Sequence, residues 1–171
     1  MKLFHVSEES NINKFIPRTP TREDMDKLES LVWAINERCL PNYLTPRDCP
    51  RVTYHTNEKT THADICKFFS SSSRHCVAIE NGWFERMGKT RLYLYEFDAS
   101  NFEMQNEVAG YYVSKQTESP ISVAIIDDLF SELFGRNVEL RVLDSLWTLG
   151  DAVQKSTLNW SLCRMANAKP R

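Results

Sequence analysis

Alternating apolar and polar side chains at the start of the chain predict a β-strand over residues 3–7, LFHVS. Leu3, Phe4 and Val6 are typical of a buried strand, and successive side chains of a strand point to opposite faces of its sheet. His5 and Ser7 are therefore expected on the face opposite Phe4 and Val6. A polar pair at this position belongs either to a solvated edge or to the floor of a binding site.

The rest of the pattern predicts short strands interrupted by short helices. Apolar or alternating runs predict strands over residues 31–35, 51–55, 76–80, 90–97, 109–115, 121–127 and 137–143. Capping residues, acidic first turns and helical spacing predict helices over residues 21–30, 61–69, 81–88, 127–135 and 145–157, with Gly135 as a C-cap and a short helix after Asn36. Residues 158–165 fit either a strand or a helix.

This order of elements predicts an α+β fold, because a doubly wound sheet would show a regular alternation of strands and helices. The chain has 171 residues and no internal repeat. That length suits one domain with a sizeable apolar core. We therefore expect a single domain over residues 1–171.

The composition and net charge of the chain make some classes of function less plausible than others. Hydrophobic residues make up 42% and charged residues 26% of the chain, as in ordinary globular proteins. The formal net charge of -2 gives no overall attraction to nucleic acid or anionic lipid. No signal-like or membrane-spanning apolar run is evident, so we expect a cytoplasmic protein. The five cysteines, an odd number without a CxxC pair, are expected as reduced thiols.

His5 and Ser7 are the first candidate site. Both side chains donate and accept hydrogen bonds, and from one face of a strand they could hold a ribose or another hydroxyl-rich ligand. The alternative is structural, because a single histidine in a strand more often serves the fold than a ligand.

The segment PRDCPR, residues 46–51, is the second candidate. Arg47 and Arg51 flank Asp48 and Cys49 in a turn bracketed by prolines. Two guanidinium groups there could clamp a phosphate, and their positive charge would lower the pKa of the Cys49 thiol. In the alternative interpretation, Asp48 pairs with one arginine in a structural turn.

Metal binding and aromatic stacking are the remaining candidates. Metal ligands could come from Cys39, Cys49, His55, His62, Cys66, His75 and Cys76, although only the His62 and Cys66 spacing on a predicted helix suits one ion. A nucleobase or nicotinamide could stack on tyrosines, and a ribose could bind a carboxylate, among Tyr93, Tyr95, Tyr111, Tyr112, Glu103, Glu107 and Glu118. Core cysteines and amphipathic sheet tyrosines are the structural alternatives. The chain lacks a glycine-rich phosphate loop and a nucleophile elbow, which disfavours nucleotide and serine hydrolysis.

Two resemblances rest on these segments. The run of LFHVSEE, LVWAI, PRDCPR, GYYVSK and LRVLDSLW resembles a small uncharacterised bacterial protein family, over essentially the whole chain. More loosely, LFHVS is similar to the first strand of ADP-ribosyltransferases, especially the rifampin-modifying type, whose histidine stands in a Tyr-His-Gly-Thr-like context. The segments LVWAINERCLPNYL, RLYLYEFDASNFE and GYYVSKQTESPISVAII resemble later elements of that fold.

The second resemblance implies an α+β domain with a split, mostly antiparallel sheet and short helices. It implies that His5 holds the ribose of NAD, that an aromatic residue packs on nicotinamide and that an acidic residue assists transfer. Trp33 stands where that family has a tyrosine, and Val6 stands where a glycine follows the histidine. Glu103 and Glu118 both remain candidates for the acid.

We therefore expect NAD or a related nucleotide in a cleft floored by His5 and Ser7, with Trp33 as a stacking wall and with the other ligand contacts from Tyr112, Arg47 and Arg51. The two arginines would contact pyrophosphate, and a transferase would displace nicotinamide through an oxocarbenium-like state. The alternative is a non-enzymatic small-ligand or protein-binding module on the same fold, and a metal-binding regulatory protein is a third option. The acceptor substrate and the oligomeric state stay open.

Overall fold

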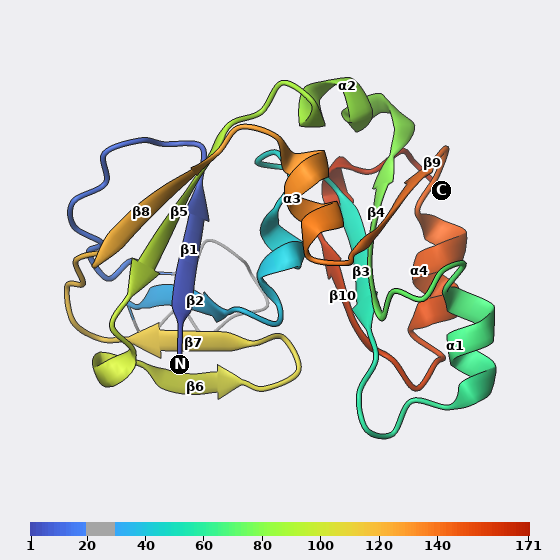
Figure 1. The fold of residues 1–171 in the computed structure, drawn as a ribbon, viewed down its shortest axis with the longest axis horizontal. Coiled ribbons are helices and arrows are strands. Elements are labelled where there is room, and N and C mark those ends of the chain that lie inside the picture. Colours follow the sequence, from blue (N-terminus) through green and yellow to red (C-terminus); the bar gives the residue numbers. More distant parts are fainter. Residues whose placement is uncertain (20–29) are drawn as a thin grey trace. The chain divides into compact units, whose positions relative to one another are not determined.

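Two compact units make up the computed structural model, which describes residues 1–19 and 30–171 (Figure 1). The first unit comprises Met1–Leu40 and Leu92–Ile125, and the second comprises Pro41–Arg91 and Ile126–Arg171. Each unit has its own sheet and apolar core. The fold is α+β, with mostly antiparallel sheets and short helices. The single domain expected from the sequence stays a prediction.

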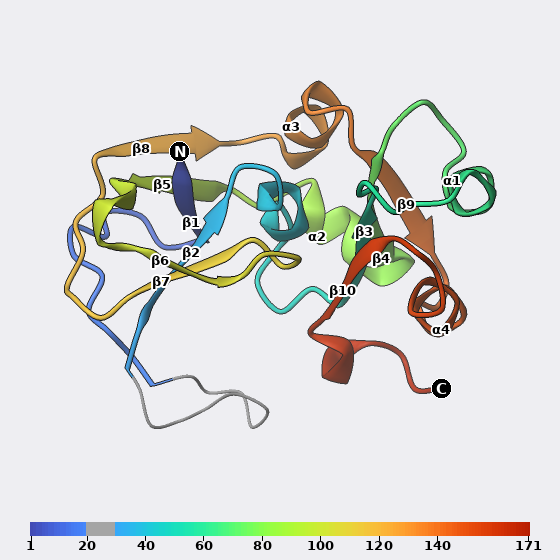
Figure 2. The same ribbon diagram turned by 90° about the horizontal axis from the view of Figure 1, so that it is seen from below.

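The first unit is built on a six-stranded sheet in the order β6-β7-β2-β1-β5-β8 (Figure 1), and Figure 2 shows the succession of β8, β5 and β1 from below. Its strands are β1 (Leu3–Ser7), β2 (Val32–Asn36), β5 (Leu92–Phe97), β6 (Glu103–Asn106), β7 (Tyr111–Ser114) and β8 (Ser122–Ile126). The pairs β1–β2, β1–β5, β2–β7 and β6–β7 are antiparallel. The 3-10 helix η3 (Ala99–Asn101) joins β5 to β6.

One face of this sheet carries the core of the first unit. Its buried members are Leu3, Phe15, Val32, Ala34, Tyr95, Phe97 and Phe102. Because Leu3 pairs with Phe97 and His5 with Tyr95 across β1 and β5, Leu3 and His5 point to this face. Phe15 reaches it from the segment after β1, which is held by two backbone hydrogen bonds of 2.8 and 3.0 Å between Phe15 and Glu118.

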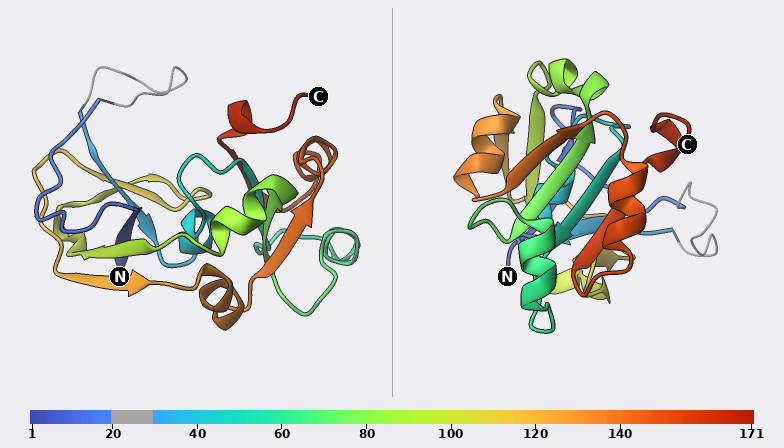
Figure 3. Two further views of the ribbon diagram at one scale, coloured as in Figure 1. Left: turned by 90° about the horizontal axis from the view of Figure 1, so that it is seen from above. Right: turned by 90° about the vertical axis from the view of Figure 1, so that its right-hand side faces the viewer.

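The second unit is built on a four-stranded sheet in the order β10-β3-β4-β9. Its strands are β3 (Arg51–His55), β4 (His75–Glu80), β9 (Glu139–Leu143) and β10 (Asn159–Cys163), and only the β4–β9 pair is parallel among them. Helices α1 (His62–Phe68) and α4 (Trp147–Val153) pack on one face (Figure 3, right). The other helices are α2 (Phe84–Met87), α3 (Leu129–Gly135), η1 (Leu40–Tyr43), η2 (Asn81–Trp83) and η4 (Met165–Asn167).

The core of the second unit lies between its sheet and these two helices. Val52 and Tyr54 of β3 and Cys76 and Ala78 of β4 are fully buried on this face. Phe68 of α1 packs against them, as do Leu146 and Val153 next to and within α4. The helix α1 forms where Thr61 caps it, because the Thr61 side chain accepts a hydrogen bond from the Asp64 backbone at 3.2 Å.

Most strands predicted from alternation are confirmed, and a few local predictions change. The predicted helix over 21–30 falls on residues that, except for Ser30, lie outside the described part. Residues 158–165 contain the strand β10, and β6 was not predicted. Gly135 is the last residue of α3 and Arg136 is its C-cap. After Asn36 the chain forms η1, and the Asn36 side chain accepts a hydrogen bond from the Cys39 backbone at 3.0 Å. Within the described residues, no helix has the length and apolarity that a bilayer crossing requires.

Candidate functional site

His5 and Ser7 lie on one face of β1, as predicted. Their partners across β5 are Tyr95 and Tyr93. The His5 side chain is half-buried, and its Nδ1 lies 3.2 Å from the backbone oxygen of Trp33. The Ser7 hydroxyl accepts a hydrogen bond of 3.0 Å from the Glu9 backbone, which fixes the turn after the strand. The two side chains therefore have structural contacts within the first unit.

Phe15 covers the position where the sequence predicted an open cleft. Its ring lies 4.9 Å from the His5 ring, and it also contacts Tyr95 at 5.2 Å and Phe97 at 4.9 Å. Phe15 is itself buried and belongs to the core of the unit. His5 therefore packs beside the core of the first unit, and its predicted place at a ligand-binding cleft stays a prediction.

Trp33 does not stand beside His5 as a stacking wall. The register pairs Leu3 with Asn36 and Phe4 with Ile35, so odd-numbered β2 residues share the face of Phe4. Trp33 consequently points to the face opposite His5, where its ring meets Tyr111 edge to face at 5.5 Å. The expected arrangement of Trp33 next to the His5 side chain is wrong.

The two acidic candidates have different positions. Glu103 is exposed on the edge strand β6 and pairs with Val113, which pairs with Trp33, so it lies on the face opposite His5. Three strand spacings separate β6 from β1, about 14 Å. Glu118 is buried and accepts a hydrogen bond of 2.6 Å from the Ser114 hydroxyl. Of the two, Glu118 is the one connected to the His5 side of the sheet, through its backbone pairing with Phe15.

Tyr112 shares the His5 face but lies two strands away. It pairs with Ala34 of β2, and it packs half-buried against the core of the first unit. No contact between Tyr112 and His5 follows from this placement, and the ligand-binding role of Tyr112 stays a prediction.

Arg47 and Arg51 belong to the second unit, where Arg51 is engaged by its own loop. The Arg51 side chain is buried. Its Nε donates a hydrogen bond to the backbone oxygen of Asn42, and its Nη1 donates one to the backbone oxygen of Cys49 at 3.0 Å. Its guanidinium also stacks 5.1 Å from the centre of the Tyr43 ring. Arg47 is exposed. Arg51 therefore organises residues 42–49, and its predicted contact with a pyrophosphate lacks support.

Cys49 is not activated by its arginine neighbours. Burial raises the pKa of its thiol to about 12, and this effect exceeds the opposing influence of the Arg51 and Arg86 charges. The sequence-based expectation of a lowered pKa is therefore wrong, because the thiol is fully buried.

Among the described residues, no group of three or more histidine, cysteine and acidic side chains is placed to hold a metal ion.

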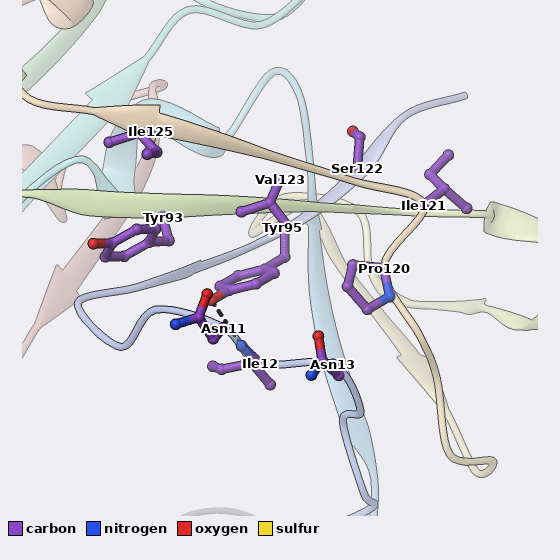
Figure 4. A pocket seen from close by; sticks show the side chains of 10 residues that line it. All are labelled: Asn11, Ile12, Asn13, Tyr93, Tyr95, Pro120, Ile121, Ser122, Val123 and Ile125. Carbon is purple, nitrogen blue, oxygen red and sulfur yellow. Dashed lines mark hydrogen bonds between the residues drawn. The ribbon is translucent and has the colours of Figure 1, made fainter.

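A pocket of about 410 Å³ lies on the core-bearing face of the first sheet, beside β8 (Figure 4). We call it the β8 pocket, and its lining consists of Asn11, Ile12, Asn13, Tyr93, Tyr95, Pro120, Ile121, Ser122, Val123 and Ile125. Tyr95 fixes the loop that closes one side of the pocket. Its hydroxyl donates a hydrogen bond to the backbone oxygen of Glu9 at 2.8 Å and accepts one from the backbone N–H of Ile12 at 3.1 Å. Asn11 turns this loop with a φ of 61°.

Some residues that line the β8 pocket stand out in the sequence, but their pattern predicts other features than this pocket. Tyr93 and Tyr95 are among the aromatic candidates, and residues 121–127 are the predicted strand that follows Pro120. The unusual feature of that run is that Ile121, Val123 and Ile125 alternate on one face and are 64%, 49% and 58% exposed. Exposed apolar side chains at alternating positions are the signal that could have pointed to this surface.

The comparisons with known proteins place the chain in a family. The model of the family of unknown function DUF6886 matches residues 4–168. The chain belongs to this family. The DUF6886 match runs through both units and includes every residue that lines the β8 pocket. No curated protein and no solved structure matches the chain.

Proposed function

We propose that this DUF6886 protein binds a small ligand in the β8 pocket, and that the ligand is a nucleoside or the nucleoside part of a nucleotide such as NAD. The observation that carries the proposal is a pocket of about 410 Å³ with aromatic, aliphatic and amide side chains on one face of the sheet. Small-molecule sites typically have volumes of about 300–1,000 Å³ and combine apolar walls with a few polar groups.

The chemistry of the lining supports an aromatic, hydroxyl-bearing and uncharged ligand part. Tyr93 is half-buried and offers a ring against which a base can stack, and the aliphatic side chains of Val123 and Ile125 on the neighbouring strand β8 also line the pocket. Asn11, Asn13 and Ser122 supply donors and acceptors for ribose hydroxyls or a base edge. None of the described residues that line the pocket is charged, so any phosphate would lie outside it.

Binding, rather than group transfer, is the activity that this geometry supports. The predicted catalytic residues His5, Glu103 and Glu118 do not line the β8 pocket. The His5 ring is covered by Phe15, and the Glu118 carboxylate is held by Ser114. An oxocarbenium-like state needs a carboxylate near the ribose. We also propose that the fold is similar to that of ADP-ribosyltransferases, and this resemblance is the reason to test NAD first.

Calorimetric titration of the full chain with NAD, adenosine and nicotinamide riboside tests the proposal. Saturable binding of at least one of them is expected in the wild type. The variant V123R places a charged side chain into the pocket and is expected to abolish binding. The matched control is V108R, because Val108 is 50% exposed, as Val123 is 49% exposed, and does not line the pocket.

The outcomes separate this site from the cleft predicted by sequence. Wild-type protein that binds none of the three ligands would rule out a nucleoside site. Binding that V123R leaves intact would place the ligand elsewhere. The variant H5A is expected to affect binding far less than V123R, whereas a selective loss in H5A would favour a site at His5.

A second candidate function, protein binding through the edge of the first sheet, is favoured by the exposure of β8. This strand ends the sheet order, and its first four residues are exposed. Residues 121–126 contain neither a charge nor a proline, which are the usual protections of an edge strand. Pairing of β8 with the same strand of a second copy would extend the sheet and bury these side chains.

Sedimentation equilibrium over a range of concentrations tests this second function. The variant A124K adds a charge to the edge without entering the pocket, since Ala124 is not among its lining residues. Association in the wild type that A124K abolishes would support pairing through β8. A wild-type chain that stays monomeric at every concentration would exclude it.

A further inference from the structure

Residues 168–171 form a short basic segment that lies beside α4 in the second unit (Figure 1). The backbone of Ala168 is extended, with a φ of -71° and a ψ of 159°, close to polyproline geometry. Pro170 has a fixed φ, and it disfavours helical geometry at the residue before it, Lys169. The segment therefore presents Lys169 and Arg171 from an extended backbone.

The main chain of Lys169 is bound on both sides. Its N–H donates to both carboxylate oxygens of Glu80, each at 3.1 Å, and its carbonyl oxygen accepts a hydrogen bond of 2.6 Å from the Trp147 indole. Glu80 is buried, and among the described residues the Lys169 N–H is the hydrogen-bond donor that its carboxylate meets. Because these bonds involve only the peptide backbone, they suit any residue that has an N–H at this place.

The two basic side chains of the segment meet acidic partners. The Lys169 ammonium lies 2.6 Å from a carboxylate oxygen of Asp144. The Arg171 guanidinium donates to both carboxylate oxygens of Asp151, at 2.8 and 3.0 Å, and it lies 4.5 Å from the centre of the Trp147 ring. These hydrogen bonds hold the pKa values of both aspartates below their usual range. Trp147 and Asp151 stand one turn apart on α4, so one helix face holds the arginine.

The segment is attached to this surface by polar contacts and can leave it without unfolding the unit. None of residues 168–171 is buried. The side chains of Lys169, Arg171 and Asp144 are 46%, 62% and 82% exposed, and exposed ion pairs contribute little to stability. Segments with few buried apolar contacts open at a low cost in free energy. Departure would remove these hydrogen bonds from the Glu80 carboxylate and the Trp147 indole, and another backbone can replace them.

We propose that Glu80, Asp144, Trp147 and Asp151, which we call the α4 site, form a docking site for an extended basic segment of a partner protein, and that residues 169–171 occupy it as an internal competitor. Charge complementarity defines the partner segment: two cationic side chains separated by one residue, preferably proline. The DUF6886 match includes all four residues of the α4 site and ends at residue 168, before Lys169. The α4 site is in the second unit and does not depend on the β8 pocket.

Anisotropy of a fluorescently labelled peptide, Asn-Ala-Lys-Pro-Arg, measures docking to the full chain; this is the sequence of residues 167–171. The double variant K169A/R171A weakens the internal competitor and should bind the peptide about tenfold more tightly than the wild type, because an attached segment competes at an effective concentration of about millimolar. A double variant that binds the peptide no more tightly than the wild type, or not at all, would overturn the proposal.

Charge reversals in the double variant locate the bound peptide. D144K and D151K should each weaken binding by about tenfold or more, because each sets a like charge against a cation of the peptide. The matched control is D127K, since Asp127 is also an exposed, ion-paired aspartate of the second unit but lies outside the α4 site. An equal loss with D127K would show general charge attraction and refute a specific site.

Sedimentation of the wild type and the double variant tests the other occupant of the α4 site. A wild type that stays monomeric over the concentration range of the titration is expected. Association of the wild type that K169A/R171A abolishes would assign the site to the same segment of a second copy, and it would overturn the proposal of a different partner.

Discussion

Alkaline pH should destabilise this protein through its three buried thiols. Burial raises the pKa of Cys39 to about 11 and that of Cys49 and Cys76 to about 12, compared with 9.0 for an exposed thiol. Because the folded-state pKa values are raised, the stabilising contribution is fully present below pH 9 and is lost as pH rises above it. At pH 10 each thiol is mostly ionised in the unfolded chain and still protonated in the folded one.

The expected loss follows from this difference in ionisation. Between pH 8 and pH 10, each thiol lowers the free energy of unfolding by roughly 1 kcal/mol or slightly more, which gives about 4 kcal/mol for the three together. The value depends mainly on the unfolded thiol, since any folded-state pKa of 11 or more gives nearly the same result. Cys39 lies in the first unit and the other two in the second, so if the units unfold in separate transitions, the second transition would lose about twice as much free energy as the first.

Urea unfolding at pH 8, 9 and 10 in the presence of a reducing agent measures the effect. The variants C39A, C49A and C76A will each be less stable at every pH, because a buried side chain is shortened. The diagnostic quantity is the loss of unfolding free energy between pH 8 and pH 10, which should be smaller than in the wild type by roughly 1 kcal/mol for each cysteine removed. If the variants lose as much as the wild type over this interval, the buried thiols are not the cause.

Two further substitutions test the packing of each unit by urea unfolding at pH 7. G110A should lower the free energy of unfolding by about 2–4 kcal/mol, because Gly110 has a φ of 69° and an added Cβ would lie 2.6 Å from the Asn36 side-chain oxygen. The control G82A should change it by less than about 1 kcal/mol, since its added Cβ meets nothing within 4 Å; equal effects would contradict the argument. Y54F should cost about 1 kcal/mol, because the fully buried Tyr54 hydroxyl donates to the Phe68 oxygen at 2.9 Å, and an unchanged stability would show that this bond contributes nothing.

Local sequence patterns predicted most of the helices and strands, but they did not predict which strands pair with one another in the sheets. The alternation of aliphatic and aromatic side chains in residues 90–97 predicted β5, and the strand is buried on both faces, by Leu92 and Leu94 on one and by Tyr95 and Phe97 on the other. The strand β6 escaped prediction because all four of its residues are exposed, so its polar side chains carry no alternation. It forms as the outer strand of a hairpin with β7 across the turn at residues 107–110, and β7 is held in the sheet by its pairing with the distant strand β2, which the composition of β6 does not reveal.

At the candidate site, the sequence predicted the sheet face of His5 correctly but did not predict which side chains lie next to it. The period of two in β1 places His5 opposite Phe4 without any knowledge of the other strands, and that part of the prediction is confirmed. The face of Trp33 depends instead on the register between β1 and β2, where a shift by one residue would bring its ring to the His5 side. Phe15 covers His5 through a segment whose position is set by Glu118, a residue about a hundred positions away. The β8 pocket arises in the same way, because Tyr95 holds the loop at Ile12 beside a strand that is distant in sequence, so its recognition required the folded arrangement.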